Sequence, residues 1–577
     1  MLLTLSLTGF TAQAQQASDA QAPERAGTAP FGARFATGKR WMVTAANPLA
    51  VEAGAAQLRA GGSAIDALVA TQLVLGLVEP QSSGLGGGAF LVYWDAERRT
   101  LTTFDGRETA PRAATPTLFL DAAGEPLPFM QAVVGGRSVG TPGTPRLLET
   151  VHARYGKRPW AELFAPARAL ATNGFIISPR LATLIAGDVE TLKRDPNARA
   201  YFLESDDTPR KQGARLRNPA YAATLEALAS GGADAFYNGA LADDMVRAVR
   251  GGANAGLLSR EDLRDYQVKE RAPVCAPYRD YEVCGMGPPS SGALTLGQIL
   301  GLLAPFDLKA LGPASPEAWR LIADASRLAF ADRERYMADS DFVPMPTEGL
   351  LAADYLKGRS ELLRGDDALP AVTAGEPTWD HARAEPRADG AAPELPSTTQ
   401  ITIVDAAGNV VSMTSTIEAG FGSRLMVGGF LLNNELTDFS FRSQKNGVPV
   451  ANRVEPGKRP RSSMAPTVVM KDGAPVLALG SPGGSQIIGY VAKTLIARLD
   501  WGMPLDQAIA APNVLARFDA VEIEAGTPAQ ALAPELKALG FEVKTAPMTS
   551  GVQAVAITPE GLVGAADPRR EGVAIGE

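Results

Sequence analysis

Histidine and cysteine are both scarce in this 577-residue chain, which contains two of each. His152 lies in the sequence LETVHARYG, which predicts a helix, and His381 lies in a Pro/Ala/acidic segment where we expect a loop. Neither histidine accompanies a GxSxG or HExxH pattern, so Ser-His-Asp hydrolysis and zinc proteolysis find little support. If the chain transfers acyl groups, we expect a base other than histidine. A nucleophile activated by its own α-amino group fits that requirement.

Other patterns are missing as well. The net charge is -8 and there is no long run of lysine or arginine, which argues against nucleic acid as a partner. No window approaches the roughly 20 apolar residues that a transmembrane helix needs, so we expect no membrane span. No phosphate-binding G-x-x-x-x-G-K-[ST] pattern occurs, and the GLGGG of Gly84–Gly88 is better explained as a tight turn than as a dinucleotide fingerprint. We expect neither a cofactor nor a metal.

The first residues favour export. Met1–Gln16 is apolar and then rich in small residues, and Ala12-Gln13-Ala14 has the A-x-A form of a signal-peptidase site. We expect residues 1–14 to be a signal peptide, residues 15–32 to be a disordered lead-in, and the protein to be periplasmic or secreted. The basic n-region is missing, so the signal is atypical or the start codon is misplaced. The alternative is a disordered cytosolic N-terminus.

The two cysteines stand in the sequence VCAPYRDYEVCG, where Cys275 and Cys284 flank Arg279-Asp280. A hairpin centred there would place the two side chains opposite each other, close enough for a disulfide. An oxidising compartment would let the bond persist, so we favour the bridge if the protein is exported. The alternative is a pair of buried free thiols.

Several helices and strands can be placed from local signals. Asn47-Pro48 predicts the start of a helix that stops at Gly61-Gly62, and Ser63 begins a second helix that ends near Pro80. Two strands, AFLVYW and TLTTFD, lead to Gly106-Arg107-Glu108. The middle third is mostly helical, with a clear start at Ser315-Pro316.

A segment without periodicity separates this part from the rest. Residues 366–397 are rich in proline, alanine and acidic residues, and we expect a mobile linker. Strand patterns follow at Thr399–Asp405 and Val410–Thr416 around an Ala-Ala-Gly-Asn turn. This hairpin would place Thr398 opposite Thr416, Ile417 or Glu418. A threonine-rich edge strand is the simpler interpretation of that hairpin alone.

A second hairpin is centred near Asp472-Gly473. Pairing residues at equal distances from this turn sets Ser462-Ser463 opposite Gly483-Gly484, and two successive glycine N–H groups can hold an oxyanion. Between the hairpins, Glu435 and Asp438 are placed to receive a substrate ammonium group. Each feature alone is explained as a turn or a solvated surface, but their joint appearance after the linker favours a site.

The motifs that carry these features are similar to those of a known family. They include NPLAVEAGAAQLRAGGSAIDALVATQLVLGLVEPQSSGLGGGAF, DGRETAP, SVGTPG, RLAFADRERYMADSDF, STTQITIVD, GFLLNNELTDFSF, KRPRSSMAPT and GSPGGSQII. The chain resembles the γ-glutamyltransferases, or glutathione hydrolases, of the N-terminal-nucleophile hydrolase superfamily, from about Val43 to Pro568.

The resemblance implies the fold and a processing step. Members have an α+β fold, a four-layer αββα sandwich, and are cleaved before a threonine into a large and a small subunit. The cut would fall between Ser397 and Thr398, giving subunits of residues 33–397 and 398–577 that form a heterodimer. One intertwined domain would then replace the several domains that the length suggests.

The resemblance also implies a role for each site residue. Thr398 would be the nucleophile in self-cleavage and in turnover, with its freed amine as the base. Thr416 would hydrogen-bond the nucleophile, and Gly483 and Gly484 would form the oxyanion hole. The substrate α-carboxylate and α-amino group would be bound by two sets of residues: Arg107, Ser462 and Ser463 for the former, and Glu418, Glu435 and Asp438 for the latter.

Two departures from the family pattern stand out. The family usually has asparagine where this chain has Glu418, so affinity and pH dependence are expected to differ. The stretch from Asp438 to Ser462 has no tyrosine and looks shorter than the lid loop of lidded bacterial members. An open site would admit bulkier γ-glutamyl amides and favour hydrolysis.

The leading hypothesis is therefore a γ-glutamyl hydrolase and transferase acting on glutathione and similar amides through an ester on Thr398. A second hypothesis is a glutaryl or cephalosporin acylase of the same family. Its substrates lack the α-amino group, so the three pocket carboxylates would stay unpaired, at a cost of several kcal/mol. A third is an inactive binding or scaffold protein. The intact Thr398, Thr416 and glycine pair argue against it.

Overall fold

The computed structural model describes residues 34–379, 385–390, 395 and 397–577. The expected signal peptide, the lead-in and His381 lie outside the described residues. Within the described part of the chain, no helix is long and apolar enough to cross a membrane.

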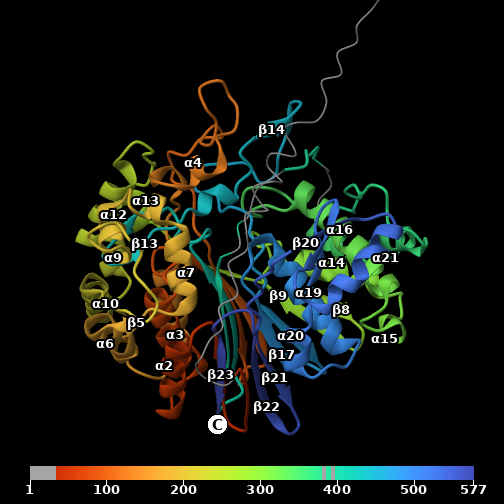
Figure 1. The fold of residues 1–577 in the computed structure, drawn as a ribbon, viewed down its shortest axis with the longest axis horizontal. Coiled ribbons are helices and arrows are strands. Elements are labelled where there is room, and N and C mark those ends of the chain that lie inside the picture. Colours follow the sequence, from red (N-terminus) through yellow and green to blue (C-terminus); the bar gives the residue numbers. More distant parts are fainter. Residues whose placement is uncertain (1–33, 380–384, 391–394, 396) are drawn as a thin grey trace, which may run out of the picture.

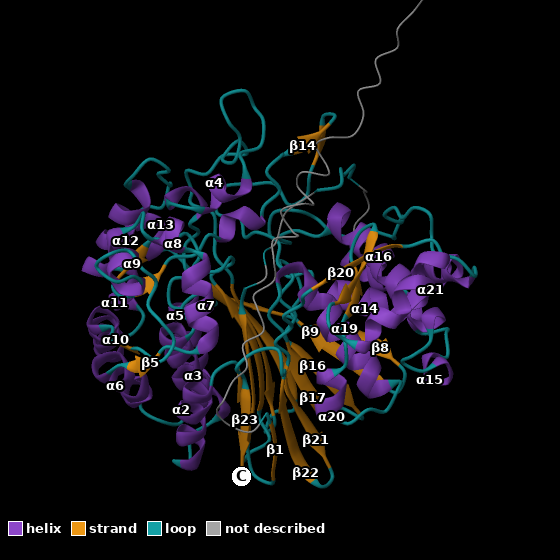
Figure 2. Cartoon of the chain, in the orientation of Figure 1, coloured by secondary structure: helices purple, strands orange, loops and turns teal. Residues whose placement is uncertain are grey.

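Two seven-stranded antiparallel sheets stack face to face, and helices cover both outer faces (Figure 1 and Figure 2). The first sheet runs β1 (Phe35–Gly38), β22 (Gly561–Ala566), β21 (Gln553–Thr558), β17 (Ala474–Gly480), β16 (Thr467–Lys471), β9 (Tyr281–Gly285) and β8 (Val274–Tyr278). The second runs β23 (Val573–Gly576), β2 (Met42–Ala45), β10 (Thr399–Val404), β11 (Val410–Thr416), β3 (Gly88–Asp95), β4 (Thr100–Gly106) and β7 (Lys269–Arg271). This arrangement confirms the expected αββα sandwich.

Each sheet mixes strands from both sides of Thr398. The second sheet, for example, places β10 and β11 between β2 and β3, which come from the first part of the chain. Neither part can complete either sheet by itself, because the missing strands would leave unpaired backbone groups in the middle of the sheet. The two parts therefore form one intertwined structure.

The helices fall into two groups, one against each sheet. Those on the second sheet's side are α2 (Pro48–Arg59), α3 (Ala64–Val78), α5 (Thr144–Tyr155), α6 (Ala165–Asn173), α7 (Pro179–Gly187), α10 (Pro219–Gly231) and α12 (Ala240–Arg250). Those on the first sheet's side are α14 (Gly292–Leu303), α16 (Pro316–Tyr336), α19 (Ile487–Leu499), α20 (Leu505–Ala510) and α21 (Ala533–Ala538).

Shorter elements complete the chain. The short helices are α4 (Phe129–Val133), α8 (Val189–Leu192), α9 (Pro196–Phe202), α11 (Asp234–Tyr237), α13 (Arg260–Arg264), α15 (Leu308–Leu311), α17 (Thr347–Leu351) and α18 (Ala353–Ser360). The short strands are β5 (Phe175–Ile176), β6 (Arg215–Leu216), β12 (Met426–Val427), β13 (Phe430–Leu431), β14 (Gln444–Lys445), β15 (Val448–Pro449), β18 (Val514–Ala516), β19 (Ala520–Glu524) and β20 (Glu542–Ala546).

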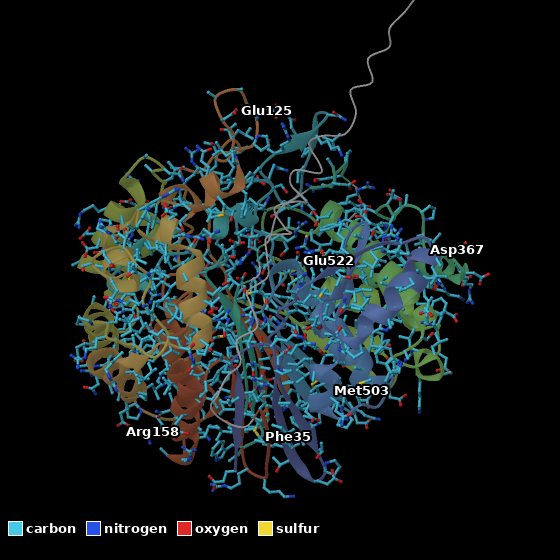
Figure 3. All side chains as sticks on the ribbon, viewed as in Figure 1. Phe35, Glu125, Arg158, Asp367, Met503 and Glu522 are labelled. Atoms are coloured by element: carbon cyan, nitrogen blue, oxygen red, sulfur yellow. A yellow bond between two sulfur atoms is a disulfide. The ribbon has the colours of Figure 1, made fainter. Side chains whose placement is uncertain are left out.

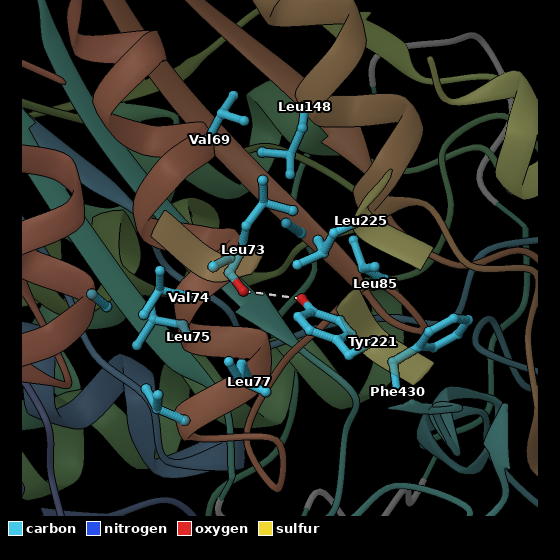
Figure 4. Close-up of a cluster of buried hydrophobic side chains, with 14 of the residues drawn as sticks. Val69, Leu73, Val74, Leu75, Leu77, Leu85, Leu148, Tyr221, Leu225 and Phe430 are labelled. Atoms are coloured by element: carbon cyan, nitrogen blue, oxygen red, sulfur yellow. Dashed lines mark hydrogen bonds between the residues drawn. The ribbon is translucent and has the colours of Figure 1, made fainter. Parts of the chain in front are cut away.

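Successive side chains along a strand point alternately into the two hydrophobic cores on either side of its sheet. On β3, Leu91 and Tyr93 belong to the core shared with the helices, whereas Val92 and Trp94 belong to the core between the sheets. Because successive side chains of a strand point to opposite faces, a strand buried on both faces is apolar throughout. Figure 4 shows part of the helix-side core, where the phenol of Tyr221 donates a hydrogen bond to the carbonyl of Leu73 at 3.0 Å.

The expected helix starts are confirmed. The side chain of Asn47 accepts a hydrogen bond from the Leu49 N–H at the start of α2. Ser63 and Asp66 form a capping box at the start of α3, and Ser315 caps α16. Each cap satisfies an N–H group that the first helical turn leaves without a partner.

The first hairpin, β10–β11, has the expected register. Thr399 pairs with Ser415, and the Asp405 carboxylate accepts hydrogen bonds from the N–H groups of Ala407 and Asn409 in the turn. Gly408 adopts a φ of +84°, which glycine reaches without steric cost. One step beyond the end of the ladder, Thr398 faces Thr416.

The second hairpin differs from the expectation. The ladder between β16 and β17 stops at Thr467 and Leu479, so Ser462 and Ser463 are not paired with the glycines across a sheet. Ser462 instead forms a bridge with Ser290. Gly483 and Gly484 have positive φ values that end the strand conformation, and the two segments approach the site as loops.

The cysteines form the expected bridge. Cys275 and Cys284 are direct cross-strand partners on β8 and β9, and their sulfur atoms are bonded. The hairpin turn at Arg279-Asp280 sets this register, as the spacing predicts.

The described parts of residues 366–397 contain no helix and no regular strand, but they are hydrogen-bonded to the body of the protein. The Ala368 N–H donates to the Leu539 carbonyl at 2.8 Å, and the Gly390 N–H donates to the Glu334 carbonyl at 3.0 Å. Ala388 also bridges to Val450, in the stretch between Asp438 and Ser462. The mobility of this segment stays a prediction.

The stretch between Asp438 and Ser462 carries the small β14–β15 hairpin at one end of the molecule (Figure 1). Next to it, Arg442 forms an ion pair with Glu125, which Figure 3 labels on a neighbouring loop. That this stretch leaves the site open to bulkier substrates stays a prediction.

Candidate active site

One small pocket gathers nearly all of the expected site residues. It is lined by Arg107, Leu395, Thr398, Thr416, Glu418, Glu435, Asp438, Ser462, Ser463, Met464, Gly484 and Ile487. The cavity measures about 20 Å³, room for little more than one water molecule. Gly483 and Ser397 are expected at the site but are not in the lining, and they contact each other beside it through their backbones.

Thr398 sits in an unusual backbone conformation. The chain continues unbroken from Ser397, and Thr398 has a φ of +86°, which is strained for a β-branched residue. Its Oγ1 lies 3.0 Å from Oγ1 of Thr416, which in turn accepts a hydrogen bond from the Glu418 N–H at 2.9 Å. These contacts hold the Thr398 hydroxyl beside the preceding peptide bond.

The carbonyl group of that peptide bond is already polarised. The Gly483 N–H donates to the Ser397 carbonyl oxygen at 3.2 Å, and the Ser397 hydroxyl donates to the Gln81 carbonyl at 2.9 Å. A Cβ on Gly483 would lie 2.6 Å from the ring of Tyr490, so only glycine fits this position. Addition of a hydroxyl to the Ser397 carbonyl would place negative charge where the Gly483 N–H points.

The polar end of the pocket combines one guanidinium with several carboxylates. Arg107 is fully buried and forms ion pairs with Glu435 and with Asp438, the latter at 2.5 Å. Both carboxylates lie on the short 3₁₀ turn η4 (Glu435–Asp438), whose geometry sets the two side chains on the same side. Burial raises the pKa of Glu435 well above its ordinary value.

Glu418 and Leu395 connect the pocket to the segment before Thr398. The Leu395 N–H donates to Oε1 of Glu418 at 3.1 Å, and the side-chain amide of Asn434 donates to Oε2. The carboxylate that the family resemblance assigns to an ammonium group thus accepts from the protein's own backbone. The uncleaved chain fills its own pocket.

The side chains of Ser462 and Ser463 are fixed by hydrogen bonds from neighbouring residues. The Arg333 guanidinium donates to Ser463 Oγ at 2.7 Å and to Ser291 Oγ at 2.9 Å. The Ser462 hydroxyl oxygen accepts from the Met464 N–H at 3.1 Å. Because both hydroxyl oxygens already accept, their protons are available to a carboxylate. Among the described residues, no group of three or more His, Cys, Asp and Glu side chains is placed to hold a metal ion.

The comparison with known families decides what this site belongs to. The model of the family described as gamma-glutamyltranspeptidase matches residues 50–577. The chain belongs to the gamma-glutamyltranspeptidase family. This membership confirms the resemblance that the motifs indicate.

Proteins named as hydrolases and proteins named as acylases are both similar to the chain. It is 39% identical over 552 residues to the glutathione hydrolase proenzyme of Bacillus subtilis (strain 168), covering 93% of this chain and 92% of that protein. It is 35% identical over 549 residues to the acylase ACY 1 proenzyme of Pseudomonas sp. (strain SE83), covering 94% of each. The crystal structure of a cephalosporin acylase from Bacillus halodurans superposes with a TM-score of 0.83 at 26% identity, covering 95% of this chain and 98% of that one. Membership of the gamma-glutamyltranspeptidase family therefore leaves the substrate open.

Two arginine side chains and one glutamate side chain at the site were not predicted from the sequence. Arg570 is fully buried and donates to the Thr398 carbonyl at 3.2 Å and to the Thr549 carbonyl at 3.2 Å. Arg333 supports Ser463, and Glu108 lies fully buried directly after Arg107. Glu108 and Arg333 stand within the family motifs DGRETAP and RLAFADRERYMADSDF, which was the available signal. No local pattern marks Arg570.

Proposed function

We propose that the chain is a self-processing γ-glutamyltransferase and glutathione hydrolase. The main support for this proposal comes from the contacts around the peptide bond between Ser397 and Thr398. The Thr398 hydroxyl lies next to Thr416, the Ser397 carbonyl accepts from Gly483, and the acidic pocket with Arg107 lies beside them. The similarity to the B. subtilis glutathione hydrolase proenzyme supports the same conclusion.

Self-cleavage begins when Thr398 Oγ1 adds to the Ser397 carbonyl carbon. The carbon–nitrogen bond then breaks, the hydroxyl proton passes to the departing nitrogen, and Ser397 is left as an ester on Thr398. Water hydrolyses the ester, which releases the Ser397 carboxylate and restores the hydroxyl. The products are a large subunit that ends at Ser397 and a small subunit of residues 398–577, which together form a heterodimer.

Turnover uses the amine that cleavage has released. The Thr398 amine accepts the proton of its own hydroxyl while Oγ1 attacks the γ-carbonyl of the substrate. The N–H groups of Gly483 and Gly484 stabilise the oxyanion, and the amine returns the proton to the departing amino group. The γ-glutamyl ester on Thr398 then passes to water or to an amino acceptor.

The polar end of the pocket matches a zwitterionic α-amino acid group. Arg107, with Ser462 and Ser463, would bind the α-carboxylate, since a guanidinium binds carboxylates bidentately. Glu418, Glu435 and Asp438 would bind the α-ammonium group. Leu395 must leave first, because the present cavity has no room for a glutamyl group.

An acylase acting on glutaryl or cephalosporin substrates is the second candidate. The similarities to acylase ACY 1 and to the cephalosporin acylase favour it. The carboxylates argue against it, because a substrate without an ammonium group leaves them buried with a single guanidinium between them. We therefore place γ-glutamyl transfer first. We also propose export to the periplasm or the medium, on the N-terminal pattern alone.

One experiment tests the cleavage, and a second tests the substrate. On denaturing gels, purified wild type should give two bands, and Thr398→Ala should stay whole. Thr399→Val is the matched control, because the Thr399 hydroxyl makes no hydrogen bond with the described residues, and it should still be cleaved. Wild type should hydrolyse γ-glutamyl anilide in preference to glutaryl anilide by roughly 100-fold. The opposite preference would favour the acylase, and an uncleaved active wild type would overturn the mechanism.

A further inference from the structure

Glu108 is a carboxyl group to which the proposed mechanism assigns no role. It follows Arg107 directly after β4, it is fully buried, and neither of its oxygens accepts a hydrogen bond from an N–H or hydroxyl group of the described residues. Its closest cation is Arg107, whose Nη1 lies 4.0 Å from Oε2. A buried carboxylate without good partners is costly, so its retention calls for a reason.

The surrounding backbone is shaped around this side chain. A Cβ on Gly88 would lie 2.4 Å from Glu108 Oε2, and a Cβ on Gly140 would lie 2.9 Å from the Glu108 Cβ. Two segments that are far apart in the sequence thus both carry glycine where Glu108 needs space. The carboxyl group is accommodated by the fold and is not a side chain that has folded inward from the surface.

The carboxyl group of Glu108 lies next to that of Glu435. Both carboxyl groups lie within reach of the same Arg107 nitrogen, Glu435 as an ion pair and Glu108 at 4.0 Å. Oε2 of Glu435 accepts no hydrogen bond from a donor group of the described residues. Two ionised carboxylates in one buried space repel each other, and a proton between them removes that repulsion.

The electrostatics of the surroundings favour the proton. Burial raises the pKa of Glu108 to about 7 and raises the pKa of Glu435 well above its ordinary value. Arg107 opposes this shift, but its charge is shared with Asp438. The charged and titratable groups that face the pair are Arg107, Asp438, Glu418 and Tyr266.

We propose that Glu108 and Glu435 hold one proton between them in the absence of substrate, and that the α-ammonium group of the substrate displaces this proton into solvent. The inference rests on the proposed function, because it takes an α-amino acid group as the ligand. The ammonium group supplies the positive charge that the proton supplied, so both carboxylates can ionise once it is bound. Glu108 is then a positioning residue that acts through Glu435, and a ligand without the ammonium group leaves the proton in place.

Because binding releases a proton, the affinity for the substrate should depend on pH. Below the pKa of the free pair, binding must release a proton, so the affinity falls as the pH falls. Above that pKa the pair is already ionised and binding is independent of pH. The KM for a γ-glutamyl anilide should rise about tenfold per pH unit below about pH 7 and should be flat above about pH 8.

Calorimetry on the mature wild type gives the direct test and requires no variant. L-Glutamate should release nearly one proton at about pH 6, measured from the difference between buffers of unlike ionisation enthalpy, and almost none at about pH 8.5. Glutarate, which lacks the ammonium group, should release none at either pH. Equal proton release at both pH values, or none with L-glutamate at the lower pH, would overturn the proposal.

Two variants test whether the released proton comes from Glu108 and Glu435. Glu108→Gln keeps the shape and can donate a hydrogen bond to Glu435, and it should abolish both the proton release and the pH dependence of KM. Glu418→Gln is the matched control; it should keep the slope but move it to lower pH, because the Glu418 charge helps to raise the pKa of Glu435. A Glu108→Gln enzyme with an unchanged slope contradicts the inference. A mature wild type that does not hydrolyse γ-glutamyl anilide contradicts the proposed function instead, which keeps the two failures apart.

Discussion

The hydroxyl oxygens of Thr398 and Thr416 lie 3.0 Å apart at the end of the β10–β11 hairpin. The hairpin register alone brings them together, since Thr399 pairs with Ser415 and the next position faces Thr416. Thr416 also accepts from the Glu418 N–H, so its side chain is fixed before any reaction occurs. The hydroxyl group that we propose as the nucleophile is therefore oriented by a neighbour on the adjacent strand.

Replacing Thr416 by valine should slow both self-cleavage and turnover. The variant keeps the shape of the side chain but loses two hydrogen bonds, one with Thr398 and one from the Glu418 N–H. The bond with Thr398 alone is worth roughly 0.5–1.5 kcal/mol, or about 2- to 10-fold in rate. The time course of band appearance on denaturing gels measures the first effect, and kcat measures the second. If Thr416→Val matched Thr399→Val in both assays, the contact would have no role in orientation.

Gly483→Ala should have a far larger effect. Gly483 has a φ of +139°, and the added Cβ would lie 2.6 Å from the Tyr490 ring, so the N–H must move away from the scissile carbonyl. Loss of an oxyanion donor typically reduces the rate by roughly 100- to 1000-fold. Gly502→Ala is the control, since it also has a positive φ but no atom within 4 Å of the added Cβ. That variant should lose some stability and keep its cleavage rate.

Glu418→Gln should separate maturation from substrate binding. In the uncleaved chain Glu418 accepts from the neutral Leu395 N–H, and the glutamine oxygen can still accept that bond, so the cleavage rate should change by at most about 2- to 10-fold. In the mature enzyme it would face a charged ammonium group, where the loss is roughly 1.5–3 kcal/mol, or about 10- to 150-fold in KM. Measuring the cleavage rate and the KM on the same preparation compares the two. Equal effects on both would show that the charge of Glu418 is not used.

Removal of the disulfide should lower stability without changing the chemistry. The bridge closes a loop with a sequence separation of 9 residues, for which loop-closure entropy predicts a loss of roughly 2–3 kcal/mol. Denaturant unfolding of a Cys275→Ser, Cys284→Ser double variant, made in the uncleavable Thr398→Ala background, measures this loss. The same double variant with Thr398 intact should show the wild-type kcat under native conditions, and a reduced kcat would show that the bridge also affects the chemistry.

The sequence determined a good deal because much of the relevant physics is local. The caps at Asn47, Ser63 and Ser315 are set by side chains within three residues of the helix start. The β10–β11 and β8–β9 registers follow from their turns, which is why the Thr398–Thr416 contact and the cysteine pair are both readable from spacing. Long family motifs supplied the αββα fold, which no periodicity argument would have reached.

Only the tertiary structure decided how the distant parts of the site meet. It brings Arg570 back to the Thr398 carbonyl, sets Arg333 behind Ser463, and places Glu108 against Glu435. These contacts join residues more than 100 positions apart, so no spacing or local propensity encodes them. The second hairpin shows the same limit, since the positive φ values of Gly483 and Gly484 end the ladder that its spacing predicts. Burial and charge pairing are properties of the assembled layers, and they appear only when the chain has folded.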